Sequence, residues 1–201
     1  MKIGVLGGTF DPVHKGHILI AEEVRASLNL DEVLFIPAGS PRLRTNVSVA
    51  TAEHRLQMVR LAIADKPHFR TSALEMERAG SSYTVDTITE LQGQVGAGAE
   101  LFLILGWDSL AKLTRWKEPP RIIRMCRLVA VPRPGYPHPD LEALEIIIPG
   151  LSNRVIMMDR PLIDISATVI RERVAGDLPI GELVPEAVER YIREHGLYAP
   201  R

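Results

Sequence analysis

Apolar residues in this chain fall either into short uninterrupted runs or into stretches with helical spacing. The uninterrupted runs predict strands over residues 1–6, 32–37, 69–74, 101–105, 127–132 and 155–158. Apolar residues three and four apart predict helices over 17–28, 51–63, 81–91, 109–114 and 183–192, with one more beginning at Ser166. The stretch 137–153 has several prolines and no clear period, and we expect it to be irregular.

The order of these elements predicts the fold class. A strand, a helix and a second strand that follow one another closely form a right-handed unit with parallel strands. The strand over 101–105 has no polar position, which is typical of a strand buried on both faces at the centre of a sheet. We therefore expect an α/β protein with a doubly wound parallel sheet and helices on both faces. An edge strand is expected at 155–158.

Composition narrows the class of protein. A formal net charge of -1 gives no basis for bulk binding to nucleic acid or to an anionic membrane. No apolar run reaches the length of a membrane span. Cys126 is the only cysteine, so no intramolecular disulfide can form, which fits a reducing cytoplasm. We expect a cytoplasmic protein, and the sequence leaves open whether it is a homo-oligomer.

Residues 7–17 carry the strongest chemical pattern in the chain. Their sequence, Gly-Gly-Thr-Phe-Asp-Pro-Val-His-Lys-Gly-His, lies between the first predicted strand and the first predicted helix. Glycines there let backbone N–H groups approach an anion, and a helix N-terminus offers free donors. His14 and His17 are three residues apart, so both imidazoles can donate to one phosphoryl group and carry positive charge as negative charge develops.

Two other interpretations of the histidine pair remain open. A metal site would need a third ligand, and only Asp11 is close in sequence. Two surface histidines in an ordinary turn would not need the glycines that flank them. The stretch also lacks the G-x-G-x-x-G pattern of dinucleotide-binding folds and the Gly-Lys-Ser/Thr of a P-loop.

The segment 7–17 resembles the H-x-G-H signature of the Rossmann-like adenylyl- and cytidylyltransferases, and most closely that of the bacterial nicotinate-nucleotide adenylyltransferases. The resemblance extends from residue 1 to about Tyr198. It implies a Rossmann-like fold in one domain, 1–201, with a core over 1–160 and a C-terminal helical part over 161–201 that completes the ATP site. The implied reaction joins ATP and nicotinate mononucleotide to give deamido-NAD and pyrophosphate, with Mg2+ carried by ATP and no metal held by the protein.

The resemblance also implies a role for individual residues in binding ATP. His14 and His17 would be catalytic, holding the α- and β-phosphates. A second motif, Ile-Ser-Ala-Thr-Val-Ile-Arg over 165–171, is similar to the family's Ile-Ser-Ser-Thr-x-Ile-Arg at a second helix N-terminus. The residues assigned to ATP and its phosphates are Gly7, Gly8, Thr9, Phe10, Arg44, Gly106, Asp108, Ile165, Ser166, Thr168 and Arg171. Arg44 stands where the family usually has lysine, and Leu43 replaces a histidine.

A further set of residues would bind nicotinate mononucleotide, namely Tyr83, Thr84, Asp108, Trp116 and Arg133. Backbone donors near Tyr83 and Thr84 would hold the nicotinate carboxylate, and Trp116 would stack on the ring. Considered without the resemblance, Ser82 or Thr84 could simply cap a helix, and Asp108 could cap the helix over 109–114. Arg133 follows a strand and is a candidate for the mononucleotide phosphate.

Alternative functions differ in substrate or in class. Another adenylyltransferase of the superfamily would use nicotinamide mononucleotide or phosphopantetheine, but Trp116 and the Tyr83-Thr84 segment favour a pyridine nucleotide. A non-catalytic nucleotide sensor could keep the fold and lose one histidine, whereas this chain keeps both His14 and His17.

Overall fold

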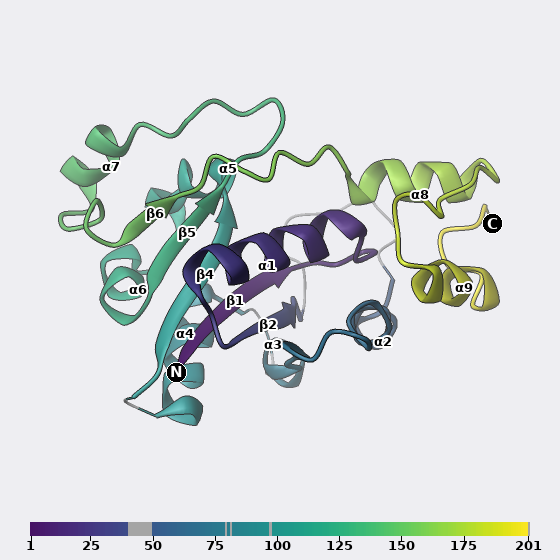
Figure 1. Ribbon diagram of the computed structural model, residues 1–201, viewed down its shortest axis with the longest axis horizontal. Helices are drawn as coiled ribbons and strands as arrows, with labels where there is room; N and C mark the ends of the chain where they lie inside the picture. Colours follow the sequence, from purple (N-terminus) through teal and green to yellow (C-terminus); the bar gives the residue numbers. More distant parts are fainter. Residues whose placement is uncertain (40–49, 79, 81, 97, 201) are drawn as a thin grey trace.

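The described residues of this computed structural model, 1–39, 50–78, 80, 82–96 and 98–200, form a single parallel sheet of six strands in the order β3-β2-β1-β4-β5-β6 (Figure 1). The strands are β1 (Lys2–Gly8), β2 (Glu32–Pro37), β3 (Phe69–Thr71), β4 (Glu100–Gly106), β5 (Arg127–Val131) and β6 (Val155–Met157). The predicted doubly wound sheet is confirmed, with β6 at an edge.

The strand order reverses between β1 and β4. From β1 the chain builds outward through β2 and β3, and from β4 it builds in the other direction through β5 and β6. Leu6 of β1 is paired with Phe35 on one side and Ile104 on the other. In open α/β sheets, ligands bind beyond the carboxyl ends of the strands at this reversal. The fold therefore places the end of β1, and the segment 7–17 that begins there, at the expected ligand position.

Helices cover both faces of the sheet (Figure 1). They are α1 (Lys15–Leu28), α2 (Ala52–Ala62), α3 (Leu74–Glu77), α4 (Thr84–Val95), α5 (Trp107–Leu110), α6 (Pro119–Met125), α7 (Leu141–Ile147), α8 (Ala167–Ala175) and α9 (Glu186–Glu194), with a 3-10 turn at Leu113–Arg115. Along β4, Phe102 and Ile104 join the core beneath α1 and α2, whereas Leu103 and Leu105 join the core beneath α4 and α6. The strand is therefore buried on both faces, as its apolar run predicts.

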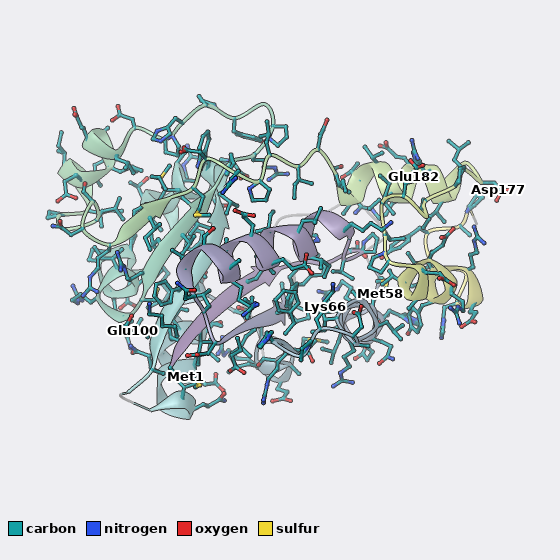
Figure 2. The ribbon with its side chains drawn as sticks, viewed as in Figure 1. Met1, Met58, Lys66, Glu100, Asp177 and Glu182 are labelled. Carbon is teal, nitrogen blue, oxygen red and sulfur yellow. The ribbon has the colours of Figure 1, made fainter. Side chains whose placement is uncertain are left out.

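The two ends of the sheet have different neighbours. Met1 and Glu100, at the starts of β1 and β4, lie together at one end (Figure 2), where the Glu100 backbone N–H donates to Met1 O over 2.9 Å. Asp177 and Glu182 lie in the C-terminal part, on the opposite side of the molecule. This C-terminal part shares the core of α1 and α2, because Ile192 of α9 and Met58 of α2 belong to the same buried cluster.

The expectation of an irregular stretch at 137–153 is wrong. The stretch contains α7, whose N-cap Asp140 accepts a hydrogen bond from the Ala143 backbone N–H over 3.0 Å. Two of its apolar residues, Ile146 and Ile147, are 82% and 62% exposed. These exposed residues obscure the helical spacing of the buried Leu144 and Ile148, so the sequence pattern does not reveal the helix.

Three boundaries also differ from the predictions. The predicted helix over 109–114 is two short turns, α5 and Leu113–Arg115, so Asp108 lies inside the first of them and does not cap it. The N-cap of α4 is Tyr83, not Ser82 or Thr84. The strand over 69–74 ends at Thr71, because Leu74 begins α3. Neither α3 nor α6 has enough turns to give a periodic signal.

No helix in the described part of the chain combines the length and the apolar character needed to cross a bilayer.

One unfolding transition is expected if the C-terminal helices and the sheet fold as one domain. Ile192→Ala removes a side chain that is 1% exposed in the shared core, and we expect it to lower the free energy of unfolding by about 2–5 kcal/mol. Glu194→Ala, at an exposed position of the same helix, should stay within about 0.5 kcal/mol of wild type. Urea unfolding followed by circular dichroism measures both. A second transition that appears only in Ile192→Ala would contradict the single domain.

Candidate active site

A cleft of about 610 Å3 lies beyond the carboxyl ends of β1 and β4. Most of the residues predicted to bind ATP or nicotinate mononucleotide line it: Gly7, Gly8, Thr9, Phe10, His14, His17, Thr84, Gly106, Asp108, Trp116, Arg133, Ile165, Ser166 and Thr168. Tyr83 and Arg171 are not part of the lining, and Arg44 lies outside the described residues. The fold therefore gathers segments from five separate parts of the sequence around one cavity.

The histidine pair forms the N-terminal cap of α1. His14 is the N-cap residue, and its backbone N–H donates to Nδ1 of His17 over 3.2 Å. The two rings are stacked, with centroids 3.7 Å apart and planes inclined by 26°. Because Nδ1 of His17 accepts this bond, the proton of the neutral imidazole belongs on Nε2. His17 is thus held as a hydrogen-bond donor at the edge of the cleft.

Both histidines are neutral at pH 7 in the ligand-free protein. Burial, with a smaller effect from the Arg133 guanidinium, lowers the pKa of His14 to about 4. Burial also lowers the pKa of His17, and His14 and Arg133 lower it further. The positive charge expected from the sequence is therefore absent before an anion binds, and a bound phosphate would raise both pKa values.

At three positions of the site, the surroundings explain why the residue is glycine. A Cβ at Gly16 would lie 3.0 Å from Nδ1 of His14 and 3.0 Å from Cγ2 of Ile163, so a larger residue would displace the His14 ring. A Cβ at Gly106 would lie 2.6 Å from Oδ1 of Asp108. A Cβ at Gly7 would meet no described atom within 4 Å, which leaves space for a ligand to approach the backbone.

Phe10 combines a core side chain with a special backbone conformation. Its φ is 50°, in the left-handed region that non-glycine residues rarely adopt. Its ring is 2% exposed and packs edge-on against His17, with ring centroids 4.9 Å apart. The aromatic ring thus holds the turn in place.

Asp108 and Arg133, both predicted to contact substrate, contact one another. Nη1 of Arg133 lies 2.8 Å from Oδ2 of Asp108, and the side chains are 54% and 12% exposed. The pair joins the end of β4 to the loop after β5 at the rim of the cleft. Sequence reasoning placed both residues at the site but did not predict their ion pair.

The start of α4 also lines the cleft. Thr84, the first residue of the helix, follows the N-cap Tyr83, and both Thr84 and Trp116 are among the lining residues. Thr87 and Glu75 are among the lining residues that were not predicted: Oγ1 of Thr87 donates to Oε1 of Glu75 over 2.8 Å, and burial raises the pKa of Glu75. Thr87 follows Tyr83 by four residues, a spacing that could have indicated it, but Glu75 depends on the unpredicted helix α3.

The second motif is divided between the cleft and its support. Ser166 is the N-cap of α8, as predicted, and its Oγ accepts from the Val169 backbone N–H over 3.2 Å. Arg171 is 8% exposed and does not itself line the cleft, but its Nη1 donates to Asp11 O over 2.7 Å and its Nη2 to Oγ1 of Thr168 over 3.3 Å, and both of these residues line the cleft. The expectation that Arg171 grips the outer phosphates stays a prediction.

Asp11 is the residue that a metal site at the histidine pair would need as its third ligand. Its Oδ1 accepts hydrogen bonds from the Ala50 backbone N–H and from the Tyr198 hydroxyl, over 3.0 and 2.7 Å. Among the described residues, no three His, Cys, Asp or Glu side chains gather in a way that could hold a metal ion.

Comparison with known proteins identifies the family. A family model described as cytidylyltransferase-like matches residues 5–173. The chain belongs to the cytidylyltransferase-like family. The matched residues include the whole of segment 7–17, which begins at the end of β1.

Individual relatives show which members of the cytidylyltransferase-like family are similar to this chain. A protein of Dehalococcoides mccartyi named probable nicotinate-nucleotide adenylyltransferase is 48% identical over 198 residues, 98% of this chain and 97% of the relative. A protein of the same name from Roseiflexus sp. is 52% identical over 197 residues, 98% and 97% of the two chains. The fold matches Plasmodium falciparum nicotinic acid mononucleotide adenylyltransferase complexed with NaAD, with a TM-score of 0.79, 17% identity and coverage of 98% and 97%.

The free energy of unfolding should decrease in acid because His14 is buried in its neutral form. Its pKa falls from 6.5 to about 4 on folding, so between these pH values the unfolded chain binds a proton that the folded protein does not. Stability due to His14 is complete above pH 6.5 and decreases as the pH falls toward 4, by about 3 kcal/mol in total. Urea unfolding at several pH values should show a shallower acid loss in His14→Asn than in wild type. Equal pH dependence of the two proteins would refute this.

Gly7→Ala should separate ligand binding from folding. The added methyl meets no described atom within 4 Å, so the free energy of unfolding should change by less than about 1 kcal/mol. The methyl would stand in the cleft, and we expect ATP binding measured by calorimetry to weaken about tenfold or more. Gly93→Ala in α4 is the matched control, since its Cβ also meets open space but lies outside the cleft lining. Unchanged ATP affinity in Gly7→Ala would contradict a ligand at this position.

Proposed function

We propose that this protein transfers the adenylyl group of ATP to nicotinate mononucleotide, forming deamido-NAD and pyrophosphate for NAD biosynthesis. The observation that carries the proposal is the stacked pair of His14 and His17, which faces the same cleft as the N-terminus of α4. A phosphate site and a carboxylate site that line one cavity suit a substrate with both groups. Relatives that cover 98% of this chain at 48–52% identity carry the name of this activity.

The chemistry requires alignment and charge stabilisation. The 5′-phosphate of nicotinate mononucleotide is ionised near pH 7 and can attack the α-phosphorus of ATP without a general base. Pyrophosphate leaves from the opposite side, with no covalent bond to the enzyme. The Nε2–H of His17 would donate to a phosphate oxygen where charge increases in the transition state. The backbone at Gly7 and Gly8 would lie against the reacting phosphate, since both residues line the cleft.

The pyridine end would lie at the start of α4. The free N–H groups and positive dipole end of this 12-residue helix favour the nicotinate carboxylate over an uncharged carboxamide. Trp116 lines the same region and can stack on the ring. Arg133 would hold the mononucleotide phosphate, and Asp108 would accept from ribose hydroxyls, after their mutual ion pair opens.

Mg2+ would enter with ATP. Asp11 and Asp108 line the cleft, and each has one buried carboxylate oxygen with no hydrogen-bond partner among the described residues, so oxygen donors suitable for hydrated Mg2+ are present. When bound, the ion would neutralise charge on the ATP phosphates.

We infer a cytoplasmic location from the single cysteine, Cys126, which is buried and unable to form an intramolecular disulfide. Assembly into a homo-oligomer stays a prediction.

A pyrophosphate-release assay tests the proposed reaction. Purified protein receives ATP and Mg2+ with nicotinate mononucleotide, nicotinamide mononucleotide or phosphopantetheine. We expect turnover with the nicotinate substrate, at least about tenfold slower turnover with the amide, and none with phosphopantetheine, because the helix N-terminus interacts more favourably with a carboxylate. His17→Ala should lower kcat by about 100-fold or more, since it removes the donor to the phosphate.

His68→Ala serves as the matched control, because His68 is exposed and lies outside the cleft lining. Its turnover should equal that of wild type. Equal turnover with the acid and the amide would keep the reaction and reject the carboxylate site. Turnover with phosphopantetheine alone would reject the substrate, and no turnover with any of the three would favour a nucleotide sensor.

A further inference from the structure

A buried polar cluster lies behind the turn Thr9–Asp11, which we call the phosphate loop. Asp11 is 2% exposed and Arg55 is 1% exposed, while Arg171 is 8% exposed. Burying charged groups is unfavourable unless hydrogen bonds and opposite charges compensate them. Neither Arg55 nor Arg171 lines the cleft, so direct contact with a ligand does not account for them.

Arg55 of α2 joins three backbone segments. Its Nη1 donates to Thr9 O over 2.8 Å, its Nη2 to Gly39 O over 2.9 Å, and its Nε to Ala50 O over 3.2 Å. The planar guanidinium presents these donors in a fixed arrangement, which lysine cannot reproduce. Because the Thr9–Phe10 peptide is planar and trans, the Phe10 N–H points away from the carbonyl that Arg55 holds. Arg55 thereby sets the direction of one backbone donor in the phosphate loop.

Asp11 receives contacts from three other parts of the chain. Its Oδ1 accepts from the Tyr198 hydroxyl over 2.7 Å and from the Ala50 backbone N–H over 3.0 Å. Its backbone carbonyl accepts from Arg171, whose Nη1 also lies 3.9 Å from Oδ2. Oδ2 is buried and has no hydrogen-bond partner among the described residues. Loss of the Tyr198 hydroxyl would therefore leave this buried carboxylate with one short hydrogen bond.

Tyr198 reaches Asp11 from the tail that follows α9, 187 residues further along the chain. Burial and the nearby Asp11 carboxylate raise the pKa of Tyr198, so the phenol keeps its proton at neutral pH and can act as the donor. The backbone of Tyr198 is in the left-handed region, with φ of 64°. A non-glycine residue keeps such a conformation only where surrounding contacts hold it, and the bond to Asp11 is one such contact.

We propose that Tyr198 is a positioning residue for adenylyl transfer, which holds the phosphate loop in its ligand-binding geometry through its hydrogen bond to Asp11, with Arg55 fixing the same loop at Thr9. This inference rests on the proposed function and extends it, because neither Tyr198 nor Arg55 touches the cleft. The C-terminal tail is thus a structural part of the phosphate site.

Tyr198→Phe tests the inference, with Tyr191→Phe as the matched control. Tyr191 belongs to the same C-terminal part, but its hydroxyl lies 2.8 Å from Nδ1 of His54, and neither of these residues lines the cleft. Each variant loses one phenol hydroxyl that connects this part to the rest of the protein. We expect Tyr198→Phe to lower kcat about tenfold or more, because misplacement of reacting groups lowers rate steeply. The KM for nicotinate mononucleotide should change less than about threefold, since its ring binds at α4.

The control should keep kcat and both KM values within about twofold of wild type. Thermal unfolding of all three proteins shows whether the two hydroxyls contribute similarly to stability. Equal kcat for the two variants would overturn the inference. If the loss in Tyr198→Phe follows its unfolding at the assay temperature, Arg55→Lys replaces it as the test: a folded Arg55→Lys with unchanged kcat would overturn the proposal, and a tenfold loss would support it.

Failure of the proposed function would give a different result from failure of the positioning role of Tyr198. If wild type releases no pyrophosphate with nicotinate mononucleotide, the substrate is wrong, and ATP binding by calorimetry becomes the test of the phosphate loop. Weaker ATP binding in Tyr198→Phe than in Tyr191→Phe would then support positioning. Equal ATP affinity in the two variants would overturn it.

Discussion

The hydrogen bond from the His14 backbone to Nδ1 of His17 is the constraint on which the site depends. It begins α1, brings the two imidazoles into a stack and leaves the proton of His17 on Nε2. The stack fits only because Gly16 has no side chain, since a Cβ there would contact the His14 ring at 3.0 Å. A backbone cap and a catalytic arrangement are therefore one structure, and the turn from β1 into α1 cannot vary without affecting both.

The phosphate loop is fixed from the protein side by Arg55, Arg171 and Tyr198, none of which lines the cleft. Arg55 and Arg171 bind its carbonyl oxygens, and Asp11 connects it to Tyr198. Two guanidinium groups and one carboxylate leave a net positive charge beneath the loop, in a buried region where screening by salt is weak. The loop backbone is thus positioned and its environment is suited to anions before any substrate arrives.

Local pattern predicted much of the fold and of the cleft. The apolar runs located all six described strands, and the segment 7–17 located the phosphate loop, because these signals lie within short stretches of sequence. What failed depends on tertiary contacts. Helix α7 exposes Ile146 and Ile147, so its pattern is hidden. The hydrogen bond from Arg171 to Asp11, 160 residues away, was not predicted. Arg55 has no sequence signal, since a buried arginine in a helix looks like any surface arginine.

Arg133 and Asp108 at the rim of the cleft are already paired with one another. A substrate that uses these side chains replaces an interaction already present, so its observed affinity is the difference between two sets of contacts. Raising the ionic strength weakens both sets, and the effects partly cancel. The salt dependence of substrate binding should therefore underestimate the number of charged contacts in the complex.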